Sequence, residues 1–90
     1  MSLSNTFSAL SDPNRQKILD LLKKKEMSVS DILTNFSITM ATLSHHLDIL
    51  KRCDLVSARR QGQQIFYSIN LSVFEEVSEK LIKFFNIKNK

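Results

Sequence analysis

The chain has 90 residues, of which 42% are hydrophobic and 24% charged, as in one small globular domain. It contains no run of about 18 apolar residues and does not begin with a basic segment followed by an apolar one. We therefore expect no membrane insertion, no secretion signal and a cytoplasmic location. A single cysteine excludes an internal disulfide framework, and with only two histidines it cannot complete a four-ligand zinc site. The net charge of +4 favours a polyanionic partner.

The first part of the chain predicts two helices separated by a break. Phe7 and Leu10 give an apolar edge to a short opening helix, which ends before Asp12. Asp12 then serves as the N-cap of a second helix over about residues 13–24, with Pro13 in its first turn, where a missing N–H costs nothing. The buried stripe of this helix comprises Ile18, Leu19 and Leu22.

The middle of the chain predicts two further helices in close succession. Ser28 and Asp31 form a capping box for a third helix, which we expect to end near Phe36. Thr39 is the predicted N-cap of a fourth helix, so that only two or three residues separate the two, with Ser37 and Ile38 forming the turn. Each start is supported by a hydrophobic staple, formed by Met27 with Ile32 and by Ile38 with Leu43. Two capped helices this close together must cross at a large angle, which predicts a helix-turn-helix.

From Leu55 onward the apolar pattern has a period of two, which is typical of strands. Val56 and Ala58 face one way, and after a turn at Gln61-Gly62 three residues alternate inward, namely Ile65, Tyr67 and Ile69. Gly62 is the chain's only glycine and lies where a positive φ is expected. The pattern therefore predicts a β-hairpin whose tip comprises residues 59–64.

The end of the chain predicts a helix with a wide apolar stripe, started by a capping box of Ser72 and Glu75. The stripe comprises Leu71, Phe74, Val77, Leu81, Ile82, Phe84 and Phe85. A monomer of this size has little surface left to cover it, so we expect a homodimer through the first and last helices. The predicted interface residues are Phe7, Leu10, Phe74, Val77, Leu81 and Phe84. Alternatively, the last helix simply closes the core of the monomer.

These elements predict a mainly α fold with a β-hairpin, a winged helix-turn-helix forming one domain over residues 1–90. This order of parts indicates that the fourth helix meets a groove of double-stranded DNA while the hairpin contacts phosphates or the minor groove. The predicted DNA-binding residues are Thr39, Met40, Thr42, Ser44 and His45 in the helix and Arg59, Arg60, Gln61 and Gln63 in the hairpin. Clustered cations also occur elsewhere, at Arg15, Lys17, Lys51 and Arg52. As an alternative, Arg59 and Arg60 are edge-strand charges that discourage aggregation.

Three further residues, His45, His46 and Cys53, each have two possible roles. His46 is expected to be a partly buried packing residue and His45 to face outward, with a metal or pH-sensing role for the pair as the alternative. Cys53 is expected to be a small buried filler, and a redox-switch thiol is the alternative. We expect no enzyme, because Ser44 and His45 are helix neighbours that face different directions and no glycine-rich phosphate loop exists. A protein-interaction module is the alternative function.

Three separated motifs carry a resemblance to a known family. They are LSDPNRQKIL (residues 10–19), TLSHHLDIL (42–50), and LV (55–56) followed by RRQG (59–62) and YSI (67–69). Together they resemble the ArsR/SmtB family of bacterial winged-helix repressors. The resemblance implies homodimers joined by the first and last helices, a recognition helix that is the fourth, and a hairpin that acts as wing. It also implies sequence-specific repression at a palindromic operator, with autoregulation as one use.

The chain departs from the metal-sensing members of that family. Many of them sense metal through a cysteine-containing pair in the helix corresponding to residues 28–35, which has no cysteine here. Others use aspartate and histidine ligands in the last helix, and residues 71–85 contain neither. The chain therefore resembles the short, metal-free SdpR-like branch, in which a protein partner or another signal controls release from DNA. We expect no metal and no cofactor.

Overall fold

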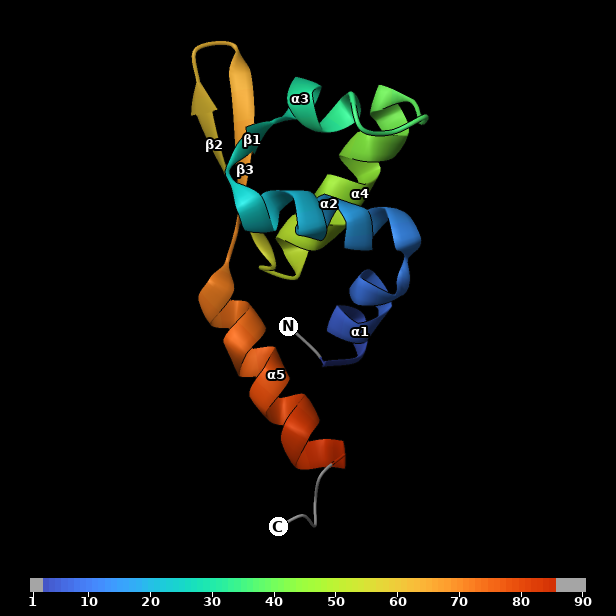
Figure 1. Ribbon diagram of the computed structural model, residues 1–90, viewed down its shortest axis with the longest axis vertical. Coiled ribbons are helices and arrows are strands. Elements are labelled where there is room, and N and C mark those ends of the chain that lie inside the picture. The colour runs from blue at the N-terminus through green and yellow to red at the C-terminus, as the bar shows by residue number, and fades with distance from the viewer. Residues whose placement is uncertain (1–2, 86–90) are drawn as a thin grey trace.

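The computed structural model describes residues 3–85, and its helices follow the predicted order (Figure 1). The elements are α1 (Leu3–Ser11), α2 (Pro13–Lys24), β1 (Met27–Ser28), α3 (Val29–Leu33), α4 (Met40–Arg52), β2 (Val56–Gln61), β3 (Gln64–Ile69) and α5 (Leu71–Phe85). The helix-turn-helix and the hairpin are therefore both present. Among these elements, no helix is long and apolar enough to cross a membrane.

Side-chain caps start the three central helices at the predicted residues. Asp12 Oδ1 accepts from the backbone N–H groups of Asn14, at 2.8 Å, and Arg15, at 3.1 Å. Ser28 Oγ accepts from the N–H of Asp31 at 3.2 Å, which starts α3. Thr39 caps α4 in the same way. These hydrogen bonds confirm the three predicted N-caps. The sequence could predict them because a cap depends only on residues two or three positions away.

The third helix ends earlier than predicted, at Leu33 instead of near Phe36. The carbonyl of Asp31 explains this, because it accepts from Thr34 Oγ1, at 2.7 Å, and from Asn35 Nδ2, at 3.1 Å. The N–H of Asn35 bonds instead to Ile32 O, in the tighter geometry of a turn. The connection to α4 therefore spans residues 34–39, and the prediction that only two or three residues separate the helices is wrong.

The hairpin belongs to a three-stranded antiparallel sheet with the order β1-β3-β2. Sequence analysis missed β1, because a strand of two residues is too short to show a period. Residues 62 and 63 form the loop between paired Gln61 and Gln64, and Gly62 has the expected positive φ of 64°. The pairing of Val56 with Ile69 and of Ala58 with Tyr67 confirms the predicted inward face.

The core lies where α2 and α4 meet and where both helices contact the sheet. It contains the predicted stripe of α2 together with Ile32, Leu43, Leu47, Leu50 and Leu55. The interior positions predicted for His46 and Cys53 are confirmed, since both are buried. The inner face of α4 is thus fixed by packing, which leaves its opposite face exposed.

The last helix begins at Leu71, so the predicted capping box of Ser72 and Glu75 is wrong and Ser72 lies inside the first turn. The first helical bonds are accepted by Asn70 O, from the N–H groups of Val73 and Phe74. The Asn70 side chain donates to Asp54 O at 2.8 Å, so it ties this start to the end of α4. From there α5 extends away from the body, at the end of the molecule opposite the hairpin tip (Figure 1).

Candidate nucleic-acid interface

The outer face of α4 carries all five helix residues that the sequence predicted for DNA contact. Thr39, Met40, Thr42, Ser44 and His45 are exposed, whereas Leu43, His46, Leu47 and Leu50 are buried. The division follows the helical period, because inward residues recur every three or four positions. None of these five residues is acidic, so the beginning of α4 can approach a polyanion closely.

Two threonines order the first turn of α4. Thr39 Oγ1 accepts from the N–H of Thr42 at 3.1 Å and donates to Thr42 Oγ1 at 3.0 Å. The Thr42 hydroxyl keeps its own proton, which can be donated to a phosphate or to a base edge. Thr39 therefore acts first as a cap, while Thr42 is poised for an external acceptor.

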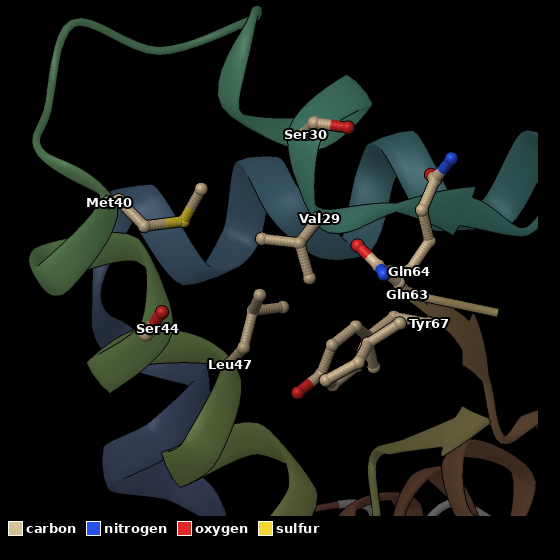
Figure 2. A pocket seen from close by; sticks show the side chains of 9 residues that line it. Val29, Ser30, Met40, Ser44, Leu47, Gln63, Gln64 and Tyr67 are labelled. Atoms are coloured by element: carbon tan, nitrogen blue, oxygen red, sulfur yellow. The ribbon is translucent and has the colours of Figure 1, made fainter. Parts of the chain in front are cut away.

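A hollow of about 330 Å³ separates α4 from the hairpin. Figure 2 shows Met40, Ser44 and Leu47 of α4 on one side and Gln63, Gln64 and Tyr67 of the hairpin on the other. Val29 and Ser30 of α3 and Ile65 of β3 complete the lining. Burial, with a contribution from Asp48, raises the pKa of Tyr67, so its hydroxyl remains a hydrogen-bond donor. The structure thus brings together predicted residues from the helix and from the hairpin.

The two arginines of the hairpin lie on opposite faces of the sheet. Arg60 is paired in register with Ile65 and faces the same side as Ala58 and Tyr67. It is exposed, and it has no hydrogen-bond or ion-pair partner in the part of the chain that the structure describes. Arg59 faces the other way, where its guanidinium binds Glu26. Of the two, Arg60 is the cation available to an external anion.

Most of the other clustered cations already have partners within the protein. Lys17 Nζ donates to Asn35 O and lies 4.7 Å from the centre of the Phe36 ring, which holds the connection between α3 and α4. Arg52 pairs with Asp48 one turn earlier on α4. The charge pattern of the sequence therefore overstates the number of cations that face a ligand.

Arg15 has a structural role that sequence analysis missed. Its Nε donates to Ala9 O at 2.8 Å, at the end of α1, and its Nη1 lies 3.1 Å from His46 Nδ1 on α4. Because arginine only donates, His46 Nδ1 is the acceptor and the ring proton is placed on Nε2. Arg15 thus links α1 and α2 to the buried side of the fourth helix. No local signal predicts this, since the partners are 31 residues apart.

The residues predicted for a dimer interface differ in their exposure. Phe84 is 64% exposed and Phe7 37%, whereas Val77 is only 7% exposed and already buried within the chain. Leu10 and Phe74 are partly buried and pack against the core. Two further apolar residues of α5 are exposed, Leu71 and Ile82. The interface stays a prediction at this point.

The arrangement defines a class of protein, the winged helix-turn-helix DNA-binding domains, in which α4 is the recognition helix and the hairpin the wing. Residues 3–85 contain no cluster of three or more histidine, cysteine or acidic side chains that could hold a metal ion. The model of the arsR family of bacterial regulatory proteins matches residues 12–58. The chain belongs to this family, whose members are transcriptional regulators and not enzymes.

Individual relatives agree with this assignment. The transcriptional repressor SdpR of Bacillus subtilis is 44% identical over 84 residues, which cover 93% of each chain. An ArsR-like transcriptional regulator from Rhodococcus sp. RHA1 superposes with a TM-score of 0.82 and 28% identity, over 91% of this chain and 77% of that one. A homodimeric winged helix-turn-helix DNA-binding domain from Mycobacterium bovis has a TM-score of 0.76 and 28% identity, over 98% and 85%.

Proposed function

We propose that the protein is a homodimeric transcriptional repressor that binds a palindromic operator. The observation that carries this proposal is the juxtaposition of two features. One is the exposed face at the beginning of α4, which has no lysine, arginine, aspartate or glutamate, and the other is Arg60 on the wing, which has no partner within residues 3–85. The helix face fits a groove, and the arginine fits the neighbouring phosphates or minor groove. The similar Bacillus protein is a transcriptional repressor, which supports repression, and not activation, by this chain.

The contacts divide into those that position the protein and those that read sequence. Ser44 and His45 can hydrogen-bond base edges, and Met40 can contact a thymine methyl group. Arg60 and Gln63 lie on the wing and serve the backbone or a narrow minor groove. Because no arginine reads guanine from α4, we expect moderate specificity per half-site.

A second copy of the chain supplies the rest of the specificity. Ile82 and Phe84 of α5 are 59% and 64% exposed, and α5 extends away from the body (Figure 1), so a symmetric copy can cover this face. The homodimeric relative from Mycobacterium supports this assembly. Two recognition helices then meet half-sites about 34 Å apart, or a multiple of that distance. The promoter region of the protein's own gene is the first DNA to test for such an operator, because binding there would indicate autoregulation.

Replacing Arg60 with alanine is expected to weaken binding to every DNA sequence. It should reduce the magnitude of the slope of log affinity against log salt by about 2, because a dimer loses two phosphate contacts at about 0.9 each. Ser44→Ala or His45→Ala should instead change the preference among sequences by about 1 to 3 kcal/mol at the contacted base pair. Fluorescence anisotropy with operator and scrambled duplexes, at several salt concentrations, measures both quantities. Identical effects of all three variants on all sequences would contradict the assigned roles, and wild-type protein without preference for any duplex would contradict the function.

Replacing Phe84 with aspartate is expected to dissociate the dimer. In a twofold interface the substitution buries two carboxylates among apolar side chains, which is unfavourable. The loss of one central aromatic contact alone costs about 2 kcal/mol or more. Sedimentation equilibrium should show a dimer dissociation constant at least roughly 30-fold higher than that of the wild type. Phe84→Leu, which keeps an apolar side chain, is the matched control. A dimer of unchanged affinity in Phe84→Asp would place the interface elsewhere.

A further inference from the structure

Glu26 and Arg59 connect the two outer strands of the sheet. Glu26 directly precedes β1, Arg59 lies in β2, and β3 runs between them. Arg59 Nε donates to Glu26 Oε2 at 2.7 Å, and Arg59 Nη2 donates to Oε1 at 2.8 Å. Two strand spacings amount to about 9.5 Å, so only two long side chains can bridge this width. The bidentate pair therefore spans the whole sheet.

The middle strand and the wing itself complete the environment of the guanidinium. Phe66 of β3 is the cross-strand partner of Arg59, and its ring centre lies 4.9 Å from the guanidinium carbon. Gln61 Oε1 accepts from Arg59 Nη1 at 2.6 Å. Groups next to or within all three strands thus fix the orientation of one side chain. A fork of this kind is far more directional than a single surface ion pair.

This pair lies where the wing loses the support of the body. The strand β1 pairs only with Phe66 and Tyr67, while the pairing of β2 with β3 continues to Gln61 and Gln64. The hairpin beyond Phe66 therefore extends past its neighbouring strand, and its tip stands clear of the helices in Figure 1. The Glu26–Arg59 contact, at the base of this extension, is suited to set the angle of the wing.

The neighbouring arginine provides the contrast. Arg60 lies on the opposite face of the same strand and, within residues 3–85, has no partner. In the neighbouring pair, the hydrogen bond from Arg59 lowers the pKa of Glu26, and the Glu26 carboxylate stays ionised at neutral pH. One arginine is thus held by the protein and the other is open to solvent.

We propose that Arg59 is a positioning residue which, together with Glu26, sets the angle of the wing so that Arg60 and Gln63 reach the DNA backbone. Arg59 itself then makes no phosphate contact, contrary to what its place in the sequence predicted. The inference rests on the proposed DNA-binding function and assigns the basic pair of the wing two different roles.

The test compares five variants by DNA anisotropy over a range of salt concentrations. They are Arg59→Ala, Glu26→Gln, the exchange Glu26→Arg with Arg59→Glu, Arg60→Ala, and Asp20→Asn. The last is the control for the loss of one negative charge, since Asp20 lies on α2 and, within residues 3–85, pairs with Lys23 alone. Thermal unfolding of each variant establishes that it is folded. Hydrogen exchange of the amides of residues 61–64, without DNA, reports on the wing directly.

We expect Arg59→Ala and Glu26→Gln each to weaken binding roughly fivefold, because a looser wing must be ordered when it binds. The salt slope should stay that of the wild type, since Arg60 still reaches the same phosphates in the complex. Both should speed hydrogen exchange at residues 61–64, whereas Arg60→Ala and Asp20→Asn should not. The double variant Glu26→Arg with Arg59→Glu should bind DNA within about twofold of the wild-type affinity, because it restores the ion pair with the charges reversed.

A phosphate contact by Arg59 predicts the opposite pattern. Glu26→Gln would then tighten binding by freeing the arginine, Arg59→Ala would lower the salt slope as Arg60→Ala does, and the exchange would bind worst. Any of these results, or unchanged hydrogen exchange in Arg59→Ala, overturns the inference. Wild-type protein that binds no duplex would overturn the proposed function instead, so the two failures are distinguishable.

Discussion

Replacing Ala41 with glutamate is expected to abolish operator binding while leaving the protein folded. Ala41 is exposed in the first turn of α4, beside Met40 and Thr42 on the face proposed to enter the groove. A carboxylate there meets DNA phosphates, and juxtaposed like charges cost several kcal/mol. Since the proposed dimer would carry the substitution twice, we expect a loss of at least roughly 100-fold in affinity. Anisotropy at a fixed salt concentration measures it.

The same substitution is close to neutral for folding. A negative charge in the first turn interacts favourably with the helix dipole, by about 0.3 to 1 kcal/mol, and this offsets the lower helix propensity of glutamate compared with alanine. The free energy of unfolding should therefore stay within about 1 kcal/mol of the wild type. Ala41→Gln, of the same size but neutral, is the control for bulk. Equal affinities of the glutamate and glutamine variants would show that this face does not meet DNA.

Replacing Leu50 with alanine is expected to have the largest effect on stability. Leu50 is fully buried on α4, in the cluster that joins this helix to α2 and the sheet. Truncation removes apolar contacts and leaves a cavity, and comparable changes in buried cores cost about 3 to 5 kcal/mol. For a domain of this size that is a fall of roughly 15 °C or more in Tm. Urea unfolding followed by circular dichroism measures the loss.

A matched control uses the same chemistry at an exposed position. Leu71 is 63% exposed at the start of α5, so Leu71→Ala should change the free energy of unfolding by no more than about 0.5 kcal/mol. Both variants and the wild type must be compared at one protein concentration, because the stability of a dimer depends on concentration. A loss in Leu50→Ala no larger than that in Leu71→Ala would contradict the assignment of Leu50 to the core.

The structure changes how the basic character of this chain is understood. A net charge of +4 suggests a polyanionic partner, yet Lys17, Arg52 and Arg59 are engaged by groups of the protein itself. The cation that remains open on the wing is Arg60. Binding to DNA therefore depends on where a few free groups lie, more than on the total charge.

Features that depend on close neighbours along the chain could be predicted from the residues alone. The N-caps at Asp12, Ser28 and Thr39, the buried stripes and the glycine turn are local, because each involves residues only a few positions apart. The outward face of α4, and with it the five predicted helix residues, followed from the helical period. The family motifs then indicated how these elements combine.

The partners of the polar side chains, in contrast, depend on how distant segments pack together in the fold. Glu26 and Arg59 are 33 residues apart, and Arg15 and His46 are 31 apart, so no periodicity brings them together. The strand β1 is equally invisible in the sequence, because a two-residue strand exists only through its pairing with β3. Arg59 and Arg60 are adjacent and both exposed, yet only Arg59 meets Glu26, because the sheet places the two side chains on opposite faces.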